Sequence, residues 1–154
     1  MYPGITKSFR LDKGMALPVK NSLIDKNLST YASVKEDTTS FDDERLEVYK
    51  GPEYDSLNAS QKKQLETKRY TIAKENSRMA YQLEETLAND LEPIITSLVL
   101  PGTVQLTPSG KLIVLMRDCQ ITGGYPRVLQ LSESAINRLS QKFTGSTLQF
   151  DLIG

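Results

Sequence analysis

Alternating apolar and polar positions predict a series of short β-strands along most of the chain. In residues 45–49, the apolar Leu46 and Val48 alternate with polar or amphipathic neighbours, which is typical of a strand with one buried face. Residues 112–116 are instead apolar without alternation, which predicts a strand covered on both faces. Related patterns predict further strands at residues 70–72, 77–83, 94–95, 103–106, 127–131 and 147–153.

Two segments have the spacing and the capping residues of helices. Residues 58–68 begin with Asn58 and Ser60, either of which can act as the N-cap. Residues 133–142 follow Ser132, and an acidic residue in the first turn suits the helix dipole. The apolar face of the first helix is thin, so we expect this helix to lie at the periphery of the fold.

Glycine and proline residues mark the turns between these elements. Pro101-Gly102 favours a type II turn. Residues 107–110 favour a type I turn, which would pair the strands on either side of it as a hairpin. Most connections are too short for parallel crossovers. The sequence therefore predicts a mainly β fold, an antiparallel barrel or sandwich with two peripheral helices.

The first 44 residues differ in character from the remainder. Residues 1–19 alternate on either side of Lys13-Gly14, which predicts a strand, a turn and a short strand. Residues 20–44 are polar and rich in Ser, Thr and Asp, which favours a surface linker of low order. We therefore expect a partial strand region with a linker over residues 1–44 and a domain over residues 45–154.

Composition narrows the range of functions. Nineteen basic and nineteen acidic residues give a formal net charge of zero, so no excess charge attracts nucleic acid or an anionic membrane. No apolar run is long enough to span a membrane, and the N-terminus has no signal-peptide pattern. The single cysteine fits a reducing, cytoplasmic location.

The residue types that are missing limit the chemistry further. The chain contains no histidine, which excludes Ser-His-Asp and Cys-His catalysis and removes the commonest zinc ligand, so no metal site is expected. No Walker-type phosphate loop occurs in the sequence. Cys119 is expected to be structural, because the neighbouring Asp118 raises the pKa of its thiol and disfavours the reactive thiolate.

Residues 117–126 contain the densest group of candidate site residues. An apolar strand ends at Met116 and is followed by Arg117, Asp118 and Gln120. Polar side chains that leave a buried strand on a tight loop are where sites are commonly built. Asp118 is the candidate catalytic residue, as a base or as a carboxylate that orients a ligand amide. Its alternative role is to accept hydrogen bonds from the backbone of the following turn.

Three further side chains have a binding interpretation and a structural one. Gln105 and Gln120 carry the donor and acceptor atoms that recognise an amide or a carboxylate, or they support the loop. Arg78 is suited to clamp a carboxylate through two hydrogen bonds, or it forms a surface ion pair. The residue types do not decide between these roles.

The glycine-containing turn has the same two interpretations. Thr122 and the amides of Gly123 and Gly124 are suited to bind an anion, or the segment is a tight turn without a ligand. The two glycines permit positive φ or a close approach of other atoms. Tyr125 is expected to be a packed ring rather than a proton donor. The candidate substrate-binding residues are Arg78, Gln105, Gln120, Thr122, Gly123, Gly124 and Tyr125.

The segment RDCQITGGYPRV, residues 117–128, resembles a signature near the C-terminus of the allophanate hydrolase subunit 2 family. Members are also known as KipA-type proteins, as the C subunit of 5-oxoprolinase and as the C-terminal part of the urea carboxylase carboxyltransferase domain. Three earlier segments follow the order of the family's motifs, which makes the resemblance specific. They are Leu46-Glu47-Val48 with Gly51-Pro52, similar to a strand and GPQ turn; residues 77–83, similar to S-x-R-M-G-Y-R-L; and residues 100–105, similar to V-P-G-x-I-Q.

The chain also departs from the family pattern. Ala80 stands where the family usually has Gly, and Gln82 where it usually has Arg. Leu98 replaces a frequent Gly, and Ile121 replaces the first Thr of TTGGYP. Family members are longer, and the glycine-rich motifs of their N-terminal half do not occur before Leu46. We therefore expect residues 45–154 to correspond to the C-terminal half of the family domain.

The resemblance implies a cyclophilin-like barrel that works in an ATP-dependent complex on a small amide or lactam, of the 5-oxoprolinase or urea/allophanate carboxyltransferase type. It implies that this chain binds no cofactor and that ATP or biotin is used elsewhere in the complex. It also implies that the chain is not active alone. The implied partners are a subunit 1 (KipI-type) protein and a lactam-utilisation-type subunit. Strand edges left open in half a domain would also favour a homodimer.

Two other functions follow from the same resemblance. One is a non-enzymatic regulatory protein that sequesters a subunit 1 (KipI-type) kinase inhibitor by surface contact. The other is a peptidyl-prolyl isomerase, suggested by the cyclophilin-like fold. The isomerase is disfavoured because a fold does not determine a function and because the cyclophilin active site requires a histidine.

Overall fold

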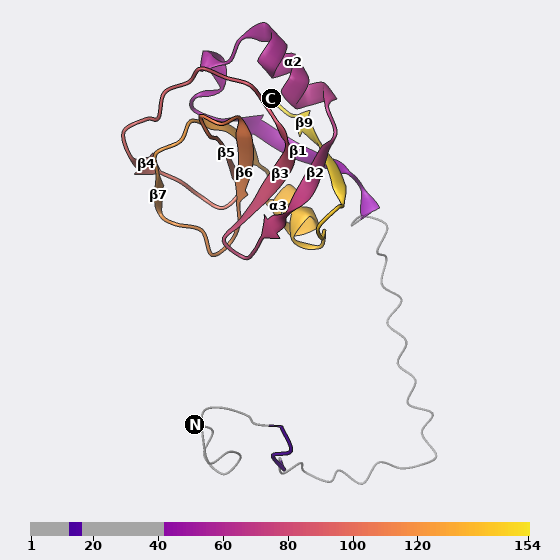
Figure 1. The fold of residues 1–154 in the computed structure, drawn as a ribbon. Coiled ribbons are helices and arrows are strands. Elements are labelled where there is room, and N and C mark those ends of the chain that lie inside the picture. The colour runs from indigo at the N-terminus through magenta and orange to yellow at the C-terminus, as the bar shows by residue number, and fades with distance from the viewer. Residues whose placement is uncertain (1–12, 17–41) are drawn as a thin grey trace. The chain divides into compact units, whose positions relative to one another are not determined.

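The computed structural model describes residues 13–16 and 42–154. The chain divides into two compact units, Met1–Glu36 and Asp37–Gly154. Figure 1 draws the described residues in colour and the remaining ones as a grey trace. The barrel and its helices belong to the second unit.

Little of the N-terminal prediction falls within the described residues. Lys13 and Gly14 form the expected turn, and Gly14 has a φ of 89°. The strands predicted on either side of this turn, within residues 1–19, lie outside the described residues. The same holds for most of the linker predicted over residues 20–44.

Seven strands close into a barrel in the order β1-β8-β5-β6-β3-β2-β9, and β4 pairs with β7 in a separate two-stranded sheet (Figure 1). Apart from the parallel pair β1 and β9, all of these pairings are antiparallel. The strands are β1 (Arg45–Lys50), β2 (Tyr70–Asn76), β3 (Ala80–Thr86), β4 (Ser97–Leu98), β5 (Thr103–Leu106), β6 (Lys111–Leu115), β7 (Thr122–Gly123), β8 (Arg127–Leu131) and β9 (Thr147–Leu152).

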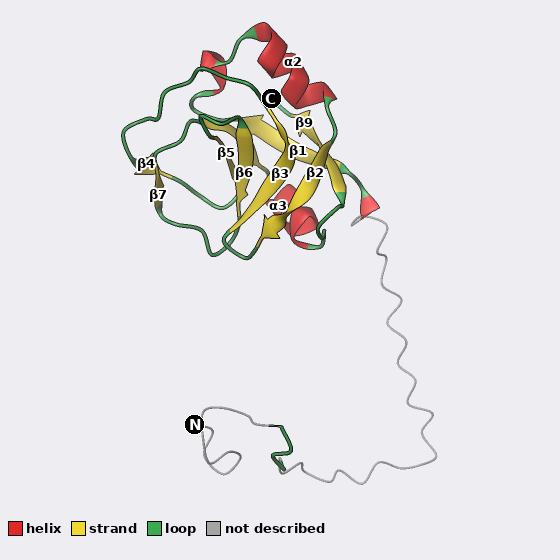
Figure 2. Cartoon of the chain, viewed as in Figure 1, coloured by secondary structure: helices red, strands yellow, loops and turns green. Residues whose placement is uncertain are grey.

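Two α-helices lie at opposite ends of the barrel, as Figure 2 shows. They are α2 (Ala59–Thr67) and α3 (Glu133–Ser140), and a short 3-10 helix, η1 (Tyr54–Ser56), precedes α2. Asn58 is the N-cap of α2, because its side chain accepts from the backbone N–H of Gln61 while the Gln61 side chain accepts from the backbone N–H of Asn58. This reciprocal pair decides between the two caps that the sequence allowed.

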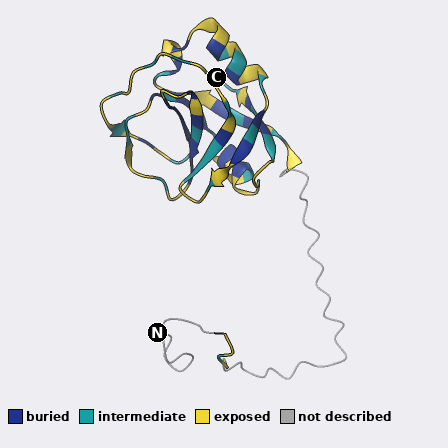
Figure 3. Cartoon of the chain, in the orientation of Figure 1, coloured by how far each residue is buried: buried dark blue, intermediate teal, exposed yellow. Residues whose placement is uncertain are grey.

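The barrel strands bury their alternate apolar residues in one core, which Figure 3 shows as dark blue segments. Leu46 and Val48 of β1 are fully buried, as their alternation predicts. The rings of Tyr70 and Phe150 pack at a centroid distance of 5.4 Å between β2 and β9. The prediction of a mainly antiparallel, cyclophilin-like barrel with two peripheral helices is confirmed.

The barrel closes within the described residues, which corrects the expectation of open edges. Leu46 pairs with Phe150, and Val48 pairs with Leu152, in the parallel register between β1 and β9. On its other side Val48 pairs with Leu131 of β8, so β1 has a neighbour along both edges. The expected homodimer therefore stays a prediction without the physical reason first given for it.

Two strand predictions are wrong in position. Residues 77–79 form the turn between β2 and β3, where Ser77 donates from its backbone N–H to Ala80 O, and Met79 is 54% exposed instead of facing inward. The strand expected at residues 94–95 is found at β4, and Ile95 is 93% exposed. Tertiary pairing, rather than the local apolar pattern, decides both boundaries.

The capping box of α2 generates a test of the fold. Asn58→Ala is expected to lower the free energy of unfolding by about 1 kcal/mol, because the backbone N–H of Gln61 loses its side-chain acceptor. Denaturant unfolding of the full chain measures this difference. Ser60→Ala, at the exposed alternative cap, is the matched control and should change stability little. An equal loss in both variants would contradict the assignment of Asn58.

Candidate functional site

The structure brings the predicted site residues together in two separate pairs. Arg78 contacts Asp118 beside the end of β6. Gln105 of β5 lies under Gly123 of β7. Gln120, Thr122 and Tyr125 are exposed on the segment that follows β6, and Tyr125 is 39% exposed rather than a fully packed ring.

Arg78 and Asp118 form a two-pronged ion pair at the surface. Arg78 donates from Nη2 to Asp118 Oδ1 at 3.2 Å, and its Nε lies 2.7 Å from Oδ2 in the ion pair. The backbone N–H of Asp118 donates to Arg78 O at 3.0 Å, so the turn and the strand end are also joined through the main chain. The two side chains are 85% and 47% exposed. Exposed pairs contribute little to stability, so a competing ligand can replace either partner at small cost.

A pocket of about 250 Å³ opens beside this ion pair. Tyr81 of β3 and Met116 supply its apolar walls, while the guanidinium groups of Arg78 and Arg117 supply its charge. Ser77 and Ser140 complete the lining. Tyr81 was not among the predicted site residues, although it lies within the motif at residues 77–83. The strand prediction treated its ring only as part of an apolar face.

Arg117, which also lines the pocket, is held by residues of α3. It donates from Nη1 to Glu133 Oε2 at 3.3 Å, from Nη2 to Glu133 Oε1, and from Nη2 to Asn137 Oδ1 at 3.0 Å. These hydrogen bonds hold the pKa of the Glu133 carboxyl below its ordinary value. The pocket therefore has two arginines, each already bound to a carboxylate of the same chain.

Gln105 is the buried member of the predicted set. Its side chain is 2% exposed, and Nε2 has no hydrogen-bond partner among the described residues. A Cβ added to Gly123 would lie 2.4 Å from this nitrogen. Neither Gly123 nor Gly124 has positive φ. Of the two uses expected for these glycines, the structure shows the close approach and not the left-handed turn.

A half-buried ion pair between Glu53 and Arg127 was not predicted. Arg127 donates to the Glu53 carboxylate from Nε at 3.0 Å, from Nη2 at 2.8 Å and from its backbone N–H at 2.8 Å. Its Nη1 donates to Leu98 O at 2.9 Å, which attaches the segment of β4 to β8. The hydrogen bonds from Arg127 to the Glu53 carboxylate hold the pKa of Glu53 below its ordinary value. The available signal was the pair of opposite charges that follow Gly51-Pro52 and Tyr125-Pro126.

Cys119 has a raised thiol pKa, as the sequence predicted, but for a different reason. Burial of the thiol raises its pKa, and a backbone hydrogen bond opposes this in part. The charge of Asp118 is not among the causes. The thiol is thus mainly protonated at neutral pH, which agrees with a structural role.

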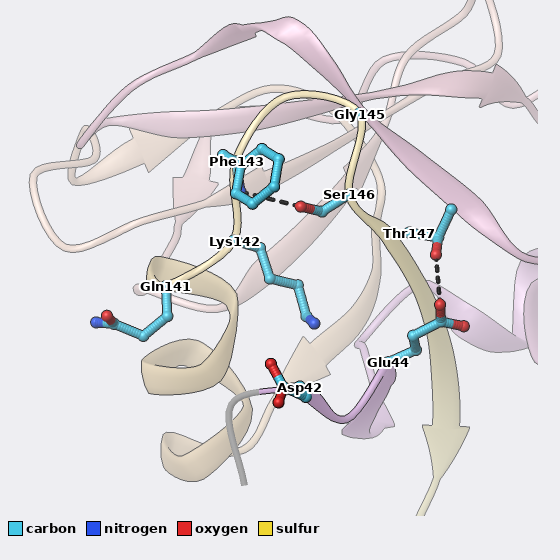
Figure 4. Close-up of a pocket in the computed structure, with 8 residues that line it drawn as sticks. All are labelled: Asp42, Glu44, Gln141, Lys142, Phe143, Gly145, Ser146 and Thr147. Carbon is cyan, nitrogen blue, oxygen red and sulfur yellow. Dashed lines mark hydrogen bonds between the residues drawn. The ribbon is translucent and has the colours of Figure 1, made fainter. Parts of the chain in front are cut away.

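A larger pocket, of about 320 Å³, lies between Asp42, Glu44 and the loop from α3 to β9 (Figure 4). Its walls are mainly polar, and the Glu44 carboxylate already accepts from the Thr147 hydroxyl at 2.6 Å. Figure 4 shows the exposed ring of Phe143 at its edge. None of the predicted site residues lines this pocket.

Two further observations concern the described residues as a whole. They contain no helix that combines the length and the apolar character needed to cross a membrane. They also contain no group of three or more cysteine, aspartate or glutamate side chains placed to hold a metal ion.

Residues 4–152 match the family described as carboxyltransferase domain, subdomain A and B. A similar protein from Escherichia coli (strain K12), named as the C subunit of 5-oxoprolinase, is 31% identical over 109 residues, which cover 69% of this chain and 35% of that protein. A protein of the same name from Haemophilus influenzae is 31% identical over 86 residues, which cover 54% and 28%. The chain thus aligns with about a third of the length of either relative.

Similar solved structures include two from Kluyveromyces lactis. Its urea carboxylase has a TM-score of 0.66 at 15% identity, covering 73% of this chain and 11% of that chain. Its urea amidolyase has a TM-score of 0.66 at 14% identity, covering 75% and 8%. At these identities the likeness concerns the fold alone.

The Glu53–Arg127 pair generates a prediction with a pH dependence. Glu53→Gln is expected to lower the free energy of unfolding by about 2 kcal/mol at neutral pH, because Arg127 loses a charged acceptor. The folded-state pKa of Glu53 lies below the ordinary value of 4.5. The advantage of the native residue is therefore complete above pH 4.5 and is lost as the pH falls through the folded-state pKa.

Denaturant unfolding of both proteins across this pH range measures the effect. Glu84→Gln, at an exposed position of β3, is the control for loss of a carboxylate. A stability difference for Glu53→Gln that does not change with pH would contradict the ion-pair explanation.

Proposed function

The chain belongs to the family of the carboxyltransferase domain, subdomain A and B, and on this premise we propose that it is a subunit of an ATP-dependent complex acting on a small amide or lactam. The relatives named as the C subunit of 5-oxoprolinase support the lactam version of this function. The structural likeness to urea carboxylase supports a shared barrel and leaves the urea/allophanate version open. Residues 45–154 are proposed to correspond to the C-terminal half of the family domain.

The observation that carries the proposal is the Arg78–Asp118 pair at the mouth of an apolar-walled pocket. A guanidinium whose nitrogens contact both oxygens of a carboxylate is suited to hold another carboxylate in the same way. The pair is exposed, so exchange of one carboxylate for another requires little desolvation. The site thus combines a clamp for an acid with walls for an apolar ring.

The proposed binding step is an exchange of partners. The carboxylate of the substrate takes the place of Asp118 on Arg78, and the ring packs against Tyr81 and Met116. The released Asp118 carboxylate then accepts from the N–H of the substrate amide or lactam. 5-Oxoproline carries both a carboxylate and a lactam N–H, so it matches both halves of this exchange. Asp118 becomes a base or an orienting acceptor only when the clamp is occupied.

The remaining parts of the chemistry are proposed to come from partners. The sequence has no Walker-type phosphate loop and no histidine, so ATP or a carried biotin is expected to be handled elsewhere in the complex. A subunit 1 (KipI-type) protein and a lactam-utilisation-type subunit are the proposed partners. The chain is accordingly expected to bind substrate alone and to turn it over only in the complex.

Substitutions at the clamp test the binding step. Arg78→Ala is expected to weaken 5-oxoproline binding about tenfold or more, because two charge-assisted hydrogen bonds are lost. Calorimetric titration of the full chain measures this affinity. Arg69→Ala is the matched control, because Arg69 is also an exposed arginine paired with a glutamate. Equal affinities in the Arg78 and Arg69 variants would contradict the clamp.

Asp118→Asn separates binding from chemistry. Removing the charge of Asp118 frees Arg78 for the ligand, so 5-oxoproline binding should be retained or strengthened. ATP-dependent turnover by the chain reconstituted with its partner subunits should fall, because the N–H of the substrate loses its charged acceptor. Unchanged turnover would show that Asp118 is only part of a structural turn.

A second candidate function is regulatory binding, in which the chain sequesters a subunit 1 (KipI-type) protein without catalysis. It is favoured by an exposed apolar surface on the β4–β7 ribbon, defined here as residues 94–100 with 121–125. Four aliphatic side chains of this ribbon are between 65% and 93% exposed: Ile95, Leu98, Leu100 and Ile121. Exposed apolar surface gathered in one place commonly marks a site of protein contact. Leu98 and Ile121 are also two of the positions at which the sequence departs from the family pattern.

Affinity co-purification from the source cells, with mass spectrometry of every partner, distinguishes the two functions. A subunit 1-type and a lactam-utilisation-type partner together favour the enzyme complex, and a biotinylated partner favours the carboxylase version. Leu98→Asp is expected to reduce recovery of the bound partner at least tenfold without changing the unfolding midpoint, since Leu98 is exposed. Unchanged recovery would exclude the ribbon as the contact surface.

A further inference from the structure

Gln105 contains a buried donor for which the described residues provide no acceptor. Its side chain is 2% exposed, yet Nε2 has no hydrogen-bond partner among these residues. A buried amide N–H without an acceptor destabilises the folded state by the cost of removing it from water. Gln105 lies between Val104 and Leu106, both fully buried in the core, so an apolar residue at position 105 would avoid that cost.

The β4–β7 ribbon covers this donor. A Cβ added to Gly123 would lie 2.4 Å from Gln105 Nε2 and 3.3 Å from Val99 Cγ1. The strands of the ribbon have two residues each, and they pair with each other rather than with a barrel strand. Ile94 donates to Gly124 O and Val99 donates to Ile121 O within the ribbon. The ribbon is therefore a separate layer, visible beside β5 and β6 in Figure 1.

Arg127 provides a second donor under the same layer. It is the partner of Gln105 in the register between β5 and β8, so the two residues are neighbours on adjacent strands. Its Nη1 donates to Leu98 O, while Nε and Nη2 are held by Glu53. Movement of the ribbon would release Nη1 without disturbing the bonds to Glu53. Two N–H donors would then face the same space.

We propose that the β4–β7 ribbon is the lid of a binding site in which Gln105 Nε2 and Arg127 Nη1 donate to the two oxygens of a small carboxylate. A carboxylate matches the site because it offers two acceptors in one plane, whereas each donor contributes one N–H. The guanidinium also supplies the positive charge that such an anion requires. Lifting of the lid exchanges the Leu98 carbonyl for one ligand oxygen and provides the first acceptor for Gln105.

This site is separate from the pocket at Arg78 and does not depend on the proposed function. The residues that form it come from β5, β8 and the ribbon, and none of them lines the pocket beside Arg78. If the carboxylate site under the ribbon is disproved, the proposed function at Arg78 is unaffected, and the reverse also holds. Variants at Gln105 test the first proposal, and variants at Arg78 test the second.

The first experiment uses acetate as the probe and sodium chloride as the control for ionic strength. In the full native chain, acetate is expected to raise the melting temperature and to speed hydrogen–deuterium exchange in residues 94–100 and 121–125. Gln105→Leu should melt at a higher temperature without ligand, because it removes the unsatisfied donor, and it should lose both responses to acetate. A lower melting temperature with unchanged acetate responses would overturn the proposal and indicate a buried water on the amide.

The glycines of the ribbon provide a matched second test. Gly123→Ala places a methyl group 2.4 Å from Gln105 Nε2, and because this side chain is buried with little room to move aside, the ribbon is expected to lift. Its exchange should become faster without ligand, and acetate should bind more tightly because the lid no longer has to be opened. Gly124→Ala meets only Ile94 O at 3.5 Å and should behave as the native chain. Identical behaviour of the two variants, or no acetate response in the native chain, would overturn the proposal.

Discussion

The parallel pairing of β1 with β9 is the constraint on which the rest of the structure depends. It joins the first and the last described strands, so the barrel has no free edge. Parallel neighbours need a long connection, and here that connection contains all the other strands and both helices. Because Leu46 and Phe150 lie fully or almost fully buried at this join, the core and the closure stabilise each other. Of the candidate site residues, Gln105 alone is buried, and the others lie on turns, on strand ends and on the separate ribbon.

Two of the arginine–carboxylate pairs, Glu53–Arg127 and Arg78–Asp118, differ chiefly in their exposure to solvent. Glu53 and Arg127 are 21% and 18% exposed, so removing either charge leaves the other poorly solvated. Arg78 and Asp118 are 85% and 47% exposed, so either can change partner at little cost. The chemistry of the two pairs is the same. The burial of the first pair fits a role in holding the ribbon on the barrel, and the exposure of the second is what the proposed exchange of ligands requires.

The ribbon connects the remaining features of the molecule. Its outer surface carries exposed aliphatic side chains, and its inner surface covers a buried amide that lacks an acceptor among the described residues. Both features cost free energy in the isolated chain. Natural proteins retain such costs mainly at functional sites, where a ligand or a partner removes them. The same short segment therefore carries both the proposed contact surface and the proposed lid.

Local signals in the sequence were sufficient for most of the barrel. The alternation of Leu46 with Val48, the cap at Ser132 and the turn at Pro101-Gly102 depend on residues that are close in the chain, and each was found where predicted. The order of four motifs also identified the family, because a linear pattern preserves their sequence and spacing.

Tertiary structure alone decided the closure and the pairing of the site residues. Arg78 and Asp118 are forty residues apart, and Glu53 and Arg127 are seventy-four apart. No local pattern states which charge meets which, because that choice depends on strand register and on burial. The same reason explains why the strand expected at residues 94–95 became part of a ribbon, and why Gln105 lost its access to water. The sequence determines which chemical groups are present. The fold determines which of them are in contact, because it sets their distances and their exposure to solvent.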